Sequence, residues 1–148
     1  MKPKKKSPLP DFHPVDILLK TSVQGDRKIL KILAEVDMSI RRKPEAGLVM
    51  MTINDGTGTD FHLGEVLVTE AEVEYEGRVG YAMVLGNNPE KALARAGVSV
   101  IMESLDSAHK TKLVDTLLRE AKKINQKERA DRALLSSTKV KFESMNQW

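Results

Sequence analysis

One stretch of strict alternation constrains the fold of this 148-residue chain more than any other feature. Glutamate occupies every second position of residues 70–76, and alanine, valine and tyrosine stand between the glutamates. Because successive side chains of a β-strand point to opposite faces, this pattern predicts a strand with one charged and one apolar face. Glu76-Gly77 predicts a tight turn, and the apolar run 79–85 predicts a more fully buried returning strand. A parallel return would need a crossover connection, so the pair is predicted to be antiparallel.

Two more segments are predicted to join this sheet. Residues 47–53 (GLVMMTI) form a short apolar run that ends at the turn signal Asn54-Asp55-Gly56. Residues 65–69 have the composition of another strand. We therefore expect several short strands joined by turns.

Helical patterns precede the predicted strands. Residues 15–23 predict a short helix, which Gly25 is expected to break. Asp26 then predicts the N-terminal cap of a second helix, whose apolar residues up to Val36 form one broad face. These segments predict two N-terminal helices.

Further helices follow the strands. Asn88 at the cap and Pro89 at the first helical position predict a helix that runs to about residue 105. After a break at residues 106–108 a long helix is predicted, with a kink or restart before Leu134. The chain thus predicts the α+β class: an antiparallel β-sheet with N-terminal helices, two or more C-terminal helices and a short C-terminal strand.

Charge and composition indicate a single soluble domain behind a basic leader. Residues 1–10 are lysine-rich and lack apolar periodicity, so we predict a disordered leader, followed by one α+β domain over residues 11–148. Subtracting the four leader lysines from the net charge of +3 leaves −1 for the body. A nucleic-acid-binding protein needs a positive patch on its fold, which makes nucleic acid an unlikely partner. The alternative kept open is a protein-interaction or nucleic-acid-binding module with a basic N-terminal tail.

Several classes of site and location are excluded by residue content. The chain has no cysteine, which excludes disulfides, thiolate metal sites and cysteine nucleophiles. No apolar stretch approaches the ~20 residues that cross a bilayer, so we expect no membrane segment and a cytoplasmic location. The histidines His13, His62 and His109 lie in separate segments without metal-binding spacing, so no metal site is predicted.

The sequence predicts no catalytic residue. Paired carboxylates can perform acid and base chemistry when their environments separate their pKa values. The four glutamates of residues 70–76 share one strand face and therefore similar surroundings. A solvated face, an acidic docking edge for a basic partner and a catalytic role remain the three readings of this stripe, with catalysis the weakest.

Two loops are candidate contact sites for an anion or a partner. Gly56-Thr57-Gly58 resembles a phosphate-binding loop, but it is not followed by the lysine and serine or threonine in fixed frame, nor by the helix, of a P-loop. It is either a turn between strands or a backbone nest that touches an anion or a partner loop. Asn87-Asn88 precedes a helix, where free N–H groups and the helix dipole favour an anion.

The end of the chain is a candidate interface strand. Within residues 138–145, Val140 and Phe142 alternate with charged residues, and Met145 at the end of the segment is a third candidate contact residue. A free strand here would expose apolar side chains and an unpaired backbone edge. We expect the segment either to pair with its own sheet or to dock on another chain, and exchange between protomers would give an intertwined dimer.

The combined order of several segments resembles the PhnG family of the bacterial carbon–phosphorus lyase system. The segments that carry the resemblance are residues 45–49, 56–66 and 79–86, the alanine-rich helix 91–104, and residues 138–145. The resemblance is good over about 45–105, looser over the N-terminal helices and the C-terminal strand, and faint between 106 and 137. Relatives often carry Arg-Asp after Gly86, where this chain has Asn87-Asn88.

The resemblance implies a role inside a larger enzyme. The family's complex is a ribose 1-phosphonate 5-triphosphate synthase, a transferase in which a phosphonate displaces adenine from ATP. It implies that the chemistry resides on a larger, nucleosidase-like sister subunit, that ATP is the substrate of the complex, and that this chain binds no cofactor. It further implies partnership with the other core subunits. From the candidate interface strand we expect two copies of this chain in the complex. Asn87 lacks the positive charge found in relatives, which argues against direct triphosphate binding there.

Overall fold

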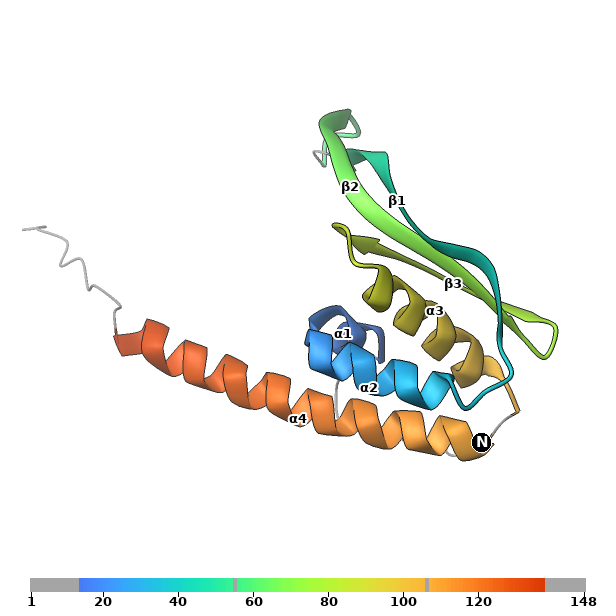
Figure 1. Ribbon diagram of the computed structural model, residues 1–148. Coiled ribbons are helices and arrows are strands. Elements are labelled where there is room, and N and C mark those ends of the chain that lie inside the picture. The colour runs from blue at the N-terminus through green and yellow to red at the C-terminus, as the bar shows by residue number, and fades with distance from the viewer. Residues whose placement is uncertain (1–13, 55, 106, 138–148) are drawn as a thin grey trace, which may run out of the picture.

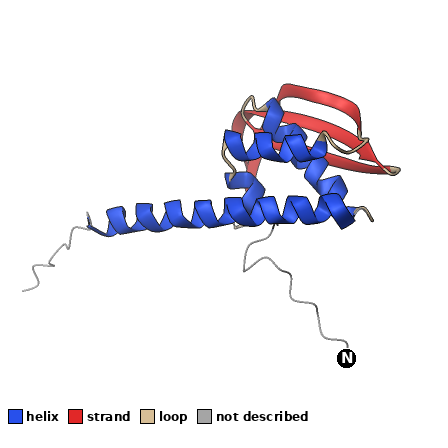
Figure 2. Cartoon of the chain, turned by 60° about the horizontal axis from the view of Figure 1, so that its bottom comes forward, coloured by secondary structure: helices blue, strands red, loops and turns tan. Residues whose placement is uncertain are grey.

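The computed structural model describes residues 14–54, 56–105 and 107–137, and its architecture confirms the predicted α+β class. Three strands form an antiparallel sheet in the order β1-β2-β3: β1 (Ser39–Asn54), β2 (Asp60–Tyr75) and β3 (Arg78–Leu85). The helices of the described residues are α1 (Pro14–Lys20), α2 (Val23–Leu33), α3 (Pro89–Glu103) and α4 (Ser107–Ser137). They all lie on one side of the sheet, with α3 against the strands and α4 farthest from them (Figures 1 and 2).

The strands are fewer and longer than predicted. Strands β1 and β2 each have 16 residues, so the segments predicted separately at 65–69 and 71–76 belong to one strand, and 47–53 is only the second half of β1. The predicted strands begin after Pro44 and after Gly64, whereas the observed strands run through both residues. Gly64 adopts a φ of 128° beside a register shift, and Pro44 lies in β1 beside another shift, so the ladder continues past both residues.

The predicted alternation in β2 and its antiparallel return are confirmed. Ala71 and Val73 are fully buried on the face toward α3, where they are opposite Ala82 and Gly80. The glutamates between them point to the other face. The turn falls at Glu76-Gly77, as the sequence predicts, and both residues have positive φ in the structure.

The core lies between the sheet and the helices, and two glycines mark its closest contacts. A Cβ atom on Gly80 would clash with the backbone carbonyl of Ala96, so β3 and α3 approach each other without a side chain between them. In α3, Gly97 is in contact with the side chain of Leu33 rather than with another backbone. The largest fully buried side chains are Ile17, Ile29, Val73, Val98, Val100, Ile101, Leu113 and Leu117.

The first two helices meet at a different point from the predicted one. Helix α2 is capped by Ser22, whose Oγ accepts the N–H of Gly25 at 3.2 Å. Gly25 therefore lies in the first turn instead of breaking the helix, and Asp26 is a buried helical residue instead of the cap. Gly25 was predicted to break the helix because glycine often ends helices. Here glycine is instead needed for close packing, because the Glu120 side chain of α4 occupies the space that a Cβ on Gly25 would need.

Helix α4 is continuous through Leu134, so the predicted kink or restart is wrong. Its first half packs on the body through Leu113 and Leu117, and its second half extends past the other helices (Figure 1). None of the described helices, the 31-residue α4 included, has the apolar length that a membrane crossing requires. The predicted strand 138–145 and the leader 1–10 lie outside the described residues.

The contact between β3 and α3 predicts a matched pair of glycine variants. Gly80→Ala should lower the free energy of unfolding by about 1–3 kcal/mol, because the new methyl group forces the strand away from the helix. Gly47→Ala, in β1, meets open space and should change it by less than about 0.5 kcal/mol. Denaturant unfolding of both variants checks the pair, and equal losses would contradict the proposed contact.

Candidate interaction surface

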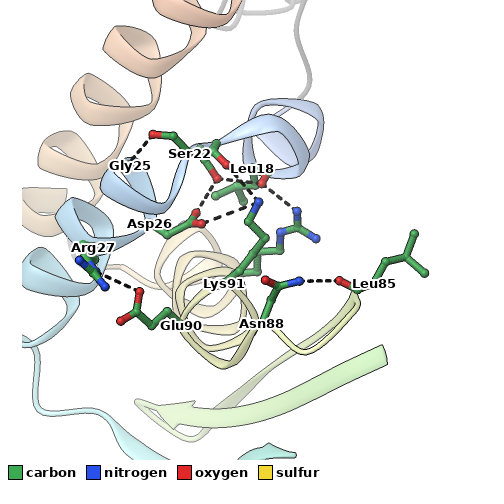
Figure 3. A network of polar contacts seen from close by, with 11 residues as sticks. Leu18, Ser22, Gly25, Asp26, Arg27, Leu85, Asn88, Glu90 and Lys91 are labelled. Atoms are coloured by element: carbon green, nitrogen blue, oxygen red, sulfur yellow. Dashed lines mark hydrogen bonds and ion pairs between the residues drawn. The ribbon is translucent and has the colours of Figure 1, made fainter. Parts of the chain in front are cut away.

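A buried polar cluster joins α1, α2 and α3 (Figure 3). The carboxylate of Asp26 is buried, accepts a hydrogen bond from the Thr21 hydroxyl and lies 3.8 Å from the Nζ of Lys91. Lys91 also donates to the Thr21 carbonyl at 3.0 Å, and Arg95 donates to the Leu18 carbonyl at 2.8 Å. Burial lowers the pKa of Arg95, and Asp26 partly offsets this effect. The cluster gives hydrogen-bond donors to the Leu18 and Thr21 carbonyls at the corner between α1 and α2, and so fixes both helices on α3. The buried Nε of Arg95 has no hydrogen-bond partner among the described residues.

The predicted contact residues Asn87 and Asn88 lie beside this cluster, at the start of α3. The backbone N–H of Asn88 donates to the Thr69 hydroxyl at 2.9 Å, and its side-chain amide donates to the Leu85 carbonyl at 2.7 Å. Asn88 occupies the N-cap position as predicted, but its side chain holds the strand end and does not cap the helix. The adjoining hollow, about 410 Å³, is lined by Asp26 and Glu90 as well as Lys91, a charge balance that does not favour an anion.

The other predicted loop lies at the far end of the β1–β2 hairpin. Gly56 and Gly58 are exposed with φ near +81° and +91°, and Gly56 N–H donates to the Asn54 side chain at 3.0 Å. The Asn54 amide in turn donates to Asp60 at 3.1 Å and closes the turn. The structure does not bring the two loops together, since the β2 residues 60–67 separate them by roughly 25 Å at about 3.3 Å per residue.

The hairpin extends well past the end of β3. Residues 48–54 and 56–67, here called the hairpin arm, lie beyond the last residue pair of β2 with β3, so this part of the sheet has only two strands (Figure 1). Apolar side chains are exposed on both of its faces, since Leu48 and Met51 point to opposite sides. The exposed large apolar residues of the arm are Leu48, Met50, Met51, Ile53, Phe61, Leu63 and Leu67. An isolated two-stranded hairpin is only marginally stable in water, so the arm requires a covering surface.

The second uncovered surface is the face of β2 and β3 opposite α3, here called the open face. Every second residue of β3 projects from it: Val79, Tyr81, Met83 and Leu85, which are 44–73% exposed. No described helix covers this face (Figure 2). A contiguous row of exposed apolar side chains on a folded domain is typical of a protein–protein interface.

The predicted glutamate stripe runs beside this apolar row, on the same face. Glu70 pairs with Arg42 and accepts a hydrogen bond from the Tyr81 hydroxyl at 2.9 Å, while Arg41 lies 3.5 Å from Glu72. Burial and the hydrogen bond to Glu70 raise the pKa of Tyr81. The stripe is therefore half-buried and paired with arginines of β1, and it is not a simple solvated face. Sequence reasoning missed the two arginines because only the strand register brings them opposite the glutamates.

The described residues hold no group of three or more histidine, aspartate or glutamate side chains arranged to share a metal ion.

A family model described as "Phosphonate metabolism protein PhnG" matches residues 13–147. No curated protein matches the chain. The matched range includes the hairpin arm, the open face and α4, so all the surfaces described above fall within the region shared with this family.

The open face predicts opposite results for two neighbouring residues of β3. Leu85→Ser, at 73% exposure, should change the free energy of unfolding by less than about 0.5 kcal/mol. Val84→Ser, at 3% exposure, should cost about 2–4 kcal/mol, because it leaves a cavity and buries a hydroxyl. Urea unfolding of the two variants checks this, and a large loss in the first would place Leu85 in the chain's own core.

The polar cluster predicts a similar contrast on α2. Asp26→Ala should lower the free energy of unfolding by about 3 kcal/mol, because Lys91 loses its buried partner. Arg27→Ala removes only an exposed ion pair with Glu90 and should cost less than about 1 kcal/mol. Thermal unfolding followed by circular dichroism distinguishes the two, and a cluster that is not structural would give similar losses for both.

Proposed function

Because the chain belongs to the PhnG family of phosphonate metabolism proteins, we propose that it is a non-catalytic subunit of the carbon–phosphorus lyase core complex. In this proposal the complex forms α-D-ribose 1-phosphonate 5-triphosphate from ATP and an alkylphosphonate, and releases adenine. The reacting groups belong to a larger, nucleosidase-like sister subunit, where ATP binds. This chain supports that subunit in the cytoplasm, and two copies are present in each complex.

The observation that supports this proposal is the amount of apolar surface left uncovered. The hairpin arm and the open face together expose large apolar side chains on three strands, including Phe61 at 59% and Leu85 at 73%. Monomeric soluble proteins rarely leave contiguous apolar patches of this kind in water. A stable interface buries on the order of 800 Å² on each partner, for which the arm and the sheet offer an extended surface.

The open face also has features that give an interface specificity. Tyrosine and methionine are enriched in protein interfaces, and Tyr81 and Met83 lie at its centre. The adjoining glutamates are already paired with Arg41 and Arg42, so their side chains are ordered before a partner arrives. Ordering that precedes binding lowers the entropic cost of association.

We predict that the purified chain releases no adenine from ATP and methylphosphonate, whereas the chain expressed with the other lyase subunits does. Phe61→Lys, at an exposed position of the arm, should leave the chain folded and reduce its copurification with those subunits at least tenfold, since a charge is buried at the interface. Leu105→Lys is the matched control, because Leu105 is 89% exposed and lies between α3 and α4, away from both surfaces.

Two results would contradict the proposal. Adenine release by the isolated chain would mean that it carries its own active site. Copurification that survives Phe61→Lys and is lost with Leu105→Lys would mean that the arm is not the docking surface. Melting curves of both variants, matched to the unaltered chain, ensure that loss of assembly is not loss of folding.

A further inference from the structure

A hollow of about 320 Å³, here called the Gly47 hollow, lies on the open face at the base of the hairpin arm. Residues of all three strands line it: Glu45, Gly47 and Val49 of β1, Val68 and Glu70 of β2, and Met83 of β3. Directly opposed residues of an antiparallel pair project to the same face. Glu45 and Met83 both stand opposite Glu70. Gly47 stands opposite Val68, two residues farther along, so the hollow faces the same way as the apolar row of β3.

The hollow exists because Gly47 has no side chain. A Cβ atom added at this position would have no other atom within 4 Å. Gly47 also lacks the positive φ that requires glycine elsewhere in the chain. Val68, directly opposite, is only 5% exposed although no described helix covers this face, so it forms the floor. Neither packing nor backbone conformation requires glycine here, and a glycine within a strand often marks the close approach of another molecule.

One wall of the hollow is easily moved. Met83 belongs to the edge strand of the sheet, since no described strand pairs with the outer side of β3. Its side chain is 44% exposed, and methionine adapts to the shape of what it contacts. A side chain from another molecule can therefore enter the hollow from the open face without displacing any part of the core.

The rim of the hollow carries a carboxylate that has no cation. The glutamates of the stripe in β2 are held by Arg41 and Arg42. Glu70 uses one carboxylate oxygen for Arg42 and the other for the Tyr81 hydroxyl. Glu45 is exposed, and no described residue forms an ion pair or hydrogen bond with its side chain. The rim is therefore complementary to one further positive charge.

We propose that the Gly47 hollow receives an arginine side chain of a sister subunit, with the guanidinium beside Glu45 and the apolar stem over Val68. Glu45 and Gly47 are two residues apart in regular register, so about 7 Å separates their Cα atoms. A long side chain that lies over Gly47 can thus cover the floor and still place its charged end at the rim.

Arginine fits this hollow better than lysine. Its planar guanidinium can donate two parallel hydrogen bonds to one carboxylate, and it is more weakly hydrated than an ammonium group. Arginine is also enriched in protein interfaces, whereas lysine is depleted. The proposal rests on the proposed function, because it names the chemistry by which the open face recognises its partner in the complex.

Filling the hollow from within the chain tests the site. Gly47→Leu should leave the melting curve unchanged and reduce copurification with the coexpressed lyase subunits at least about tenfold, because the leucine occupies the place of the arginine stem. Gly47→Ala is the matched control, which adds one methyl group and should reduce copurification less than about threefold. A folded Gly47→Leu variant that copurifies like the unaltered chain overturns the proposal.

Removing the charge at the rim tests the occupant. Glu45→Gln keeps the size of the side chain and should reduce copurification about tenfold, and the remaining binding should depend less on salt. Glu103→Gln, the same change at an exposed position of α3, should alter neither quantity. If Gly47→Leu blocks assembly while Glu45→Gln changes neither the yield nor its salt dependence, an uncharged side chain enters the hollow and the proposal is wrong.

A crosslink identifies the side chain that enters. Photoreactive p-benzoylphenylalanine in place of Leu85, which stands opposite Val68 and is 73% exposed, should crosslink to one segment of a sister subunit in the assembled complex. Mass spectrometry should locate an arginine in that segment. Its replacement by glutamine should weaken assembly non-additively with Glu45→Gln, since both variants break the same pair. A segment without arginine, or additive losses, contradicts the proposal.

The outcomes separate this proposal from the proposed function. If the chain copurifies with the lyase subunits whatever stands at positions 45 and 47, the subunit role holds and the arginine hollow is overturned. If the unaltered chain does not copurify with those subunits, the subunit role is overturned, and the assignment of the hollow to a sister subunit falls with it.

Discussion

The close contact between α3 and the sheet is the constraint on which the rest of the structure depends. It requires Gly80 to have no side chain, since Ala96 places a backbone carbonyl where a Cβ atom would be. The fully buried alanines Ala92, Ala94 and Ala96 keep α3 thin, so it lies between the sheet and the other helices. Helices α2 and α4 then pack around α3 instead of on the strands, which leaves the opposite sheet face bare. A bulkier residue at Gly80 would alter the spacing of every layer at once.

The bare face is ordered without being covered, and this combination suits a subunit that assembles with others. The arginines of β1 hold the glutamates of β2, and Glu70 holds the Tyr81 hydroxyl, so the polar half of the face has fixed geometry. The apolar half remains in contact with water. The polar half can select among partners and the apolar half supplies the free energy of binding. The polar cluster around Asp26 lies on the other side of the sheet and serves the fold.

The sequence predicted the parts of the fold that follow from local periodicity. The alternation of residues 70–76 correctly predicted a strand, its buried face and its turn, and Asn88-Pro89 correctly predicted the start of α3. Errors arose where glycine or proline has a tertiary role: Gly25 makes room for Glu120, and Gly64 lies at a bulge inside a long strand. The open face could not be predicted, because an apolar strand buried on two faces and one buried on a single face have similar sequences.

The bare edge of β3 has a consequence for biosynthesis. Strand β3 ends at Leu85, and the end of α4 follows about 50 residues later, which ribosomes translate in roughly 3–10 s. Throughout that interval a nascent chain exposes an unpaired strand edge and the apolar side chains of the hairpin arm, and none of the described elements made later covers them. Neighbouring nascent chains on one messenger RNA are the nearest available strands. Cells that make this protein should therefore gain from producing its partners at the same time and place, and a chain made in excess should be prone to aggregation.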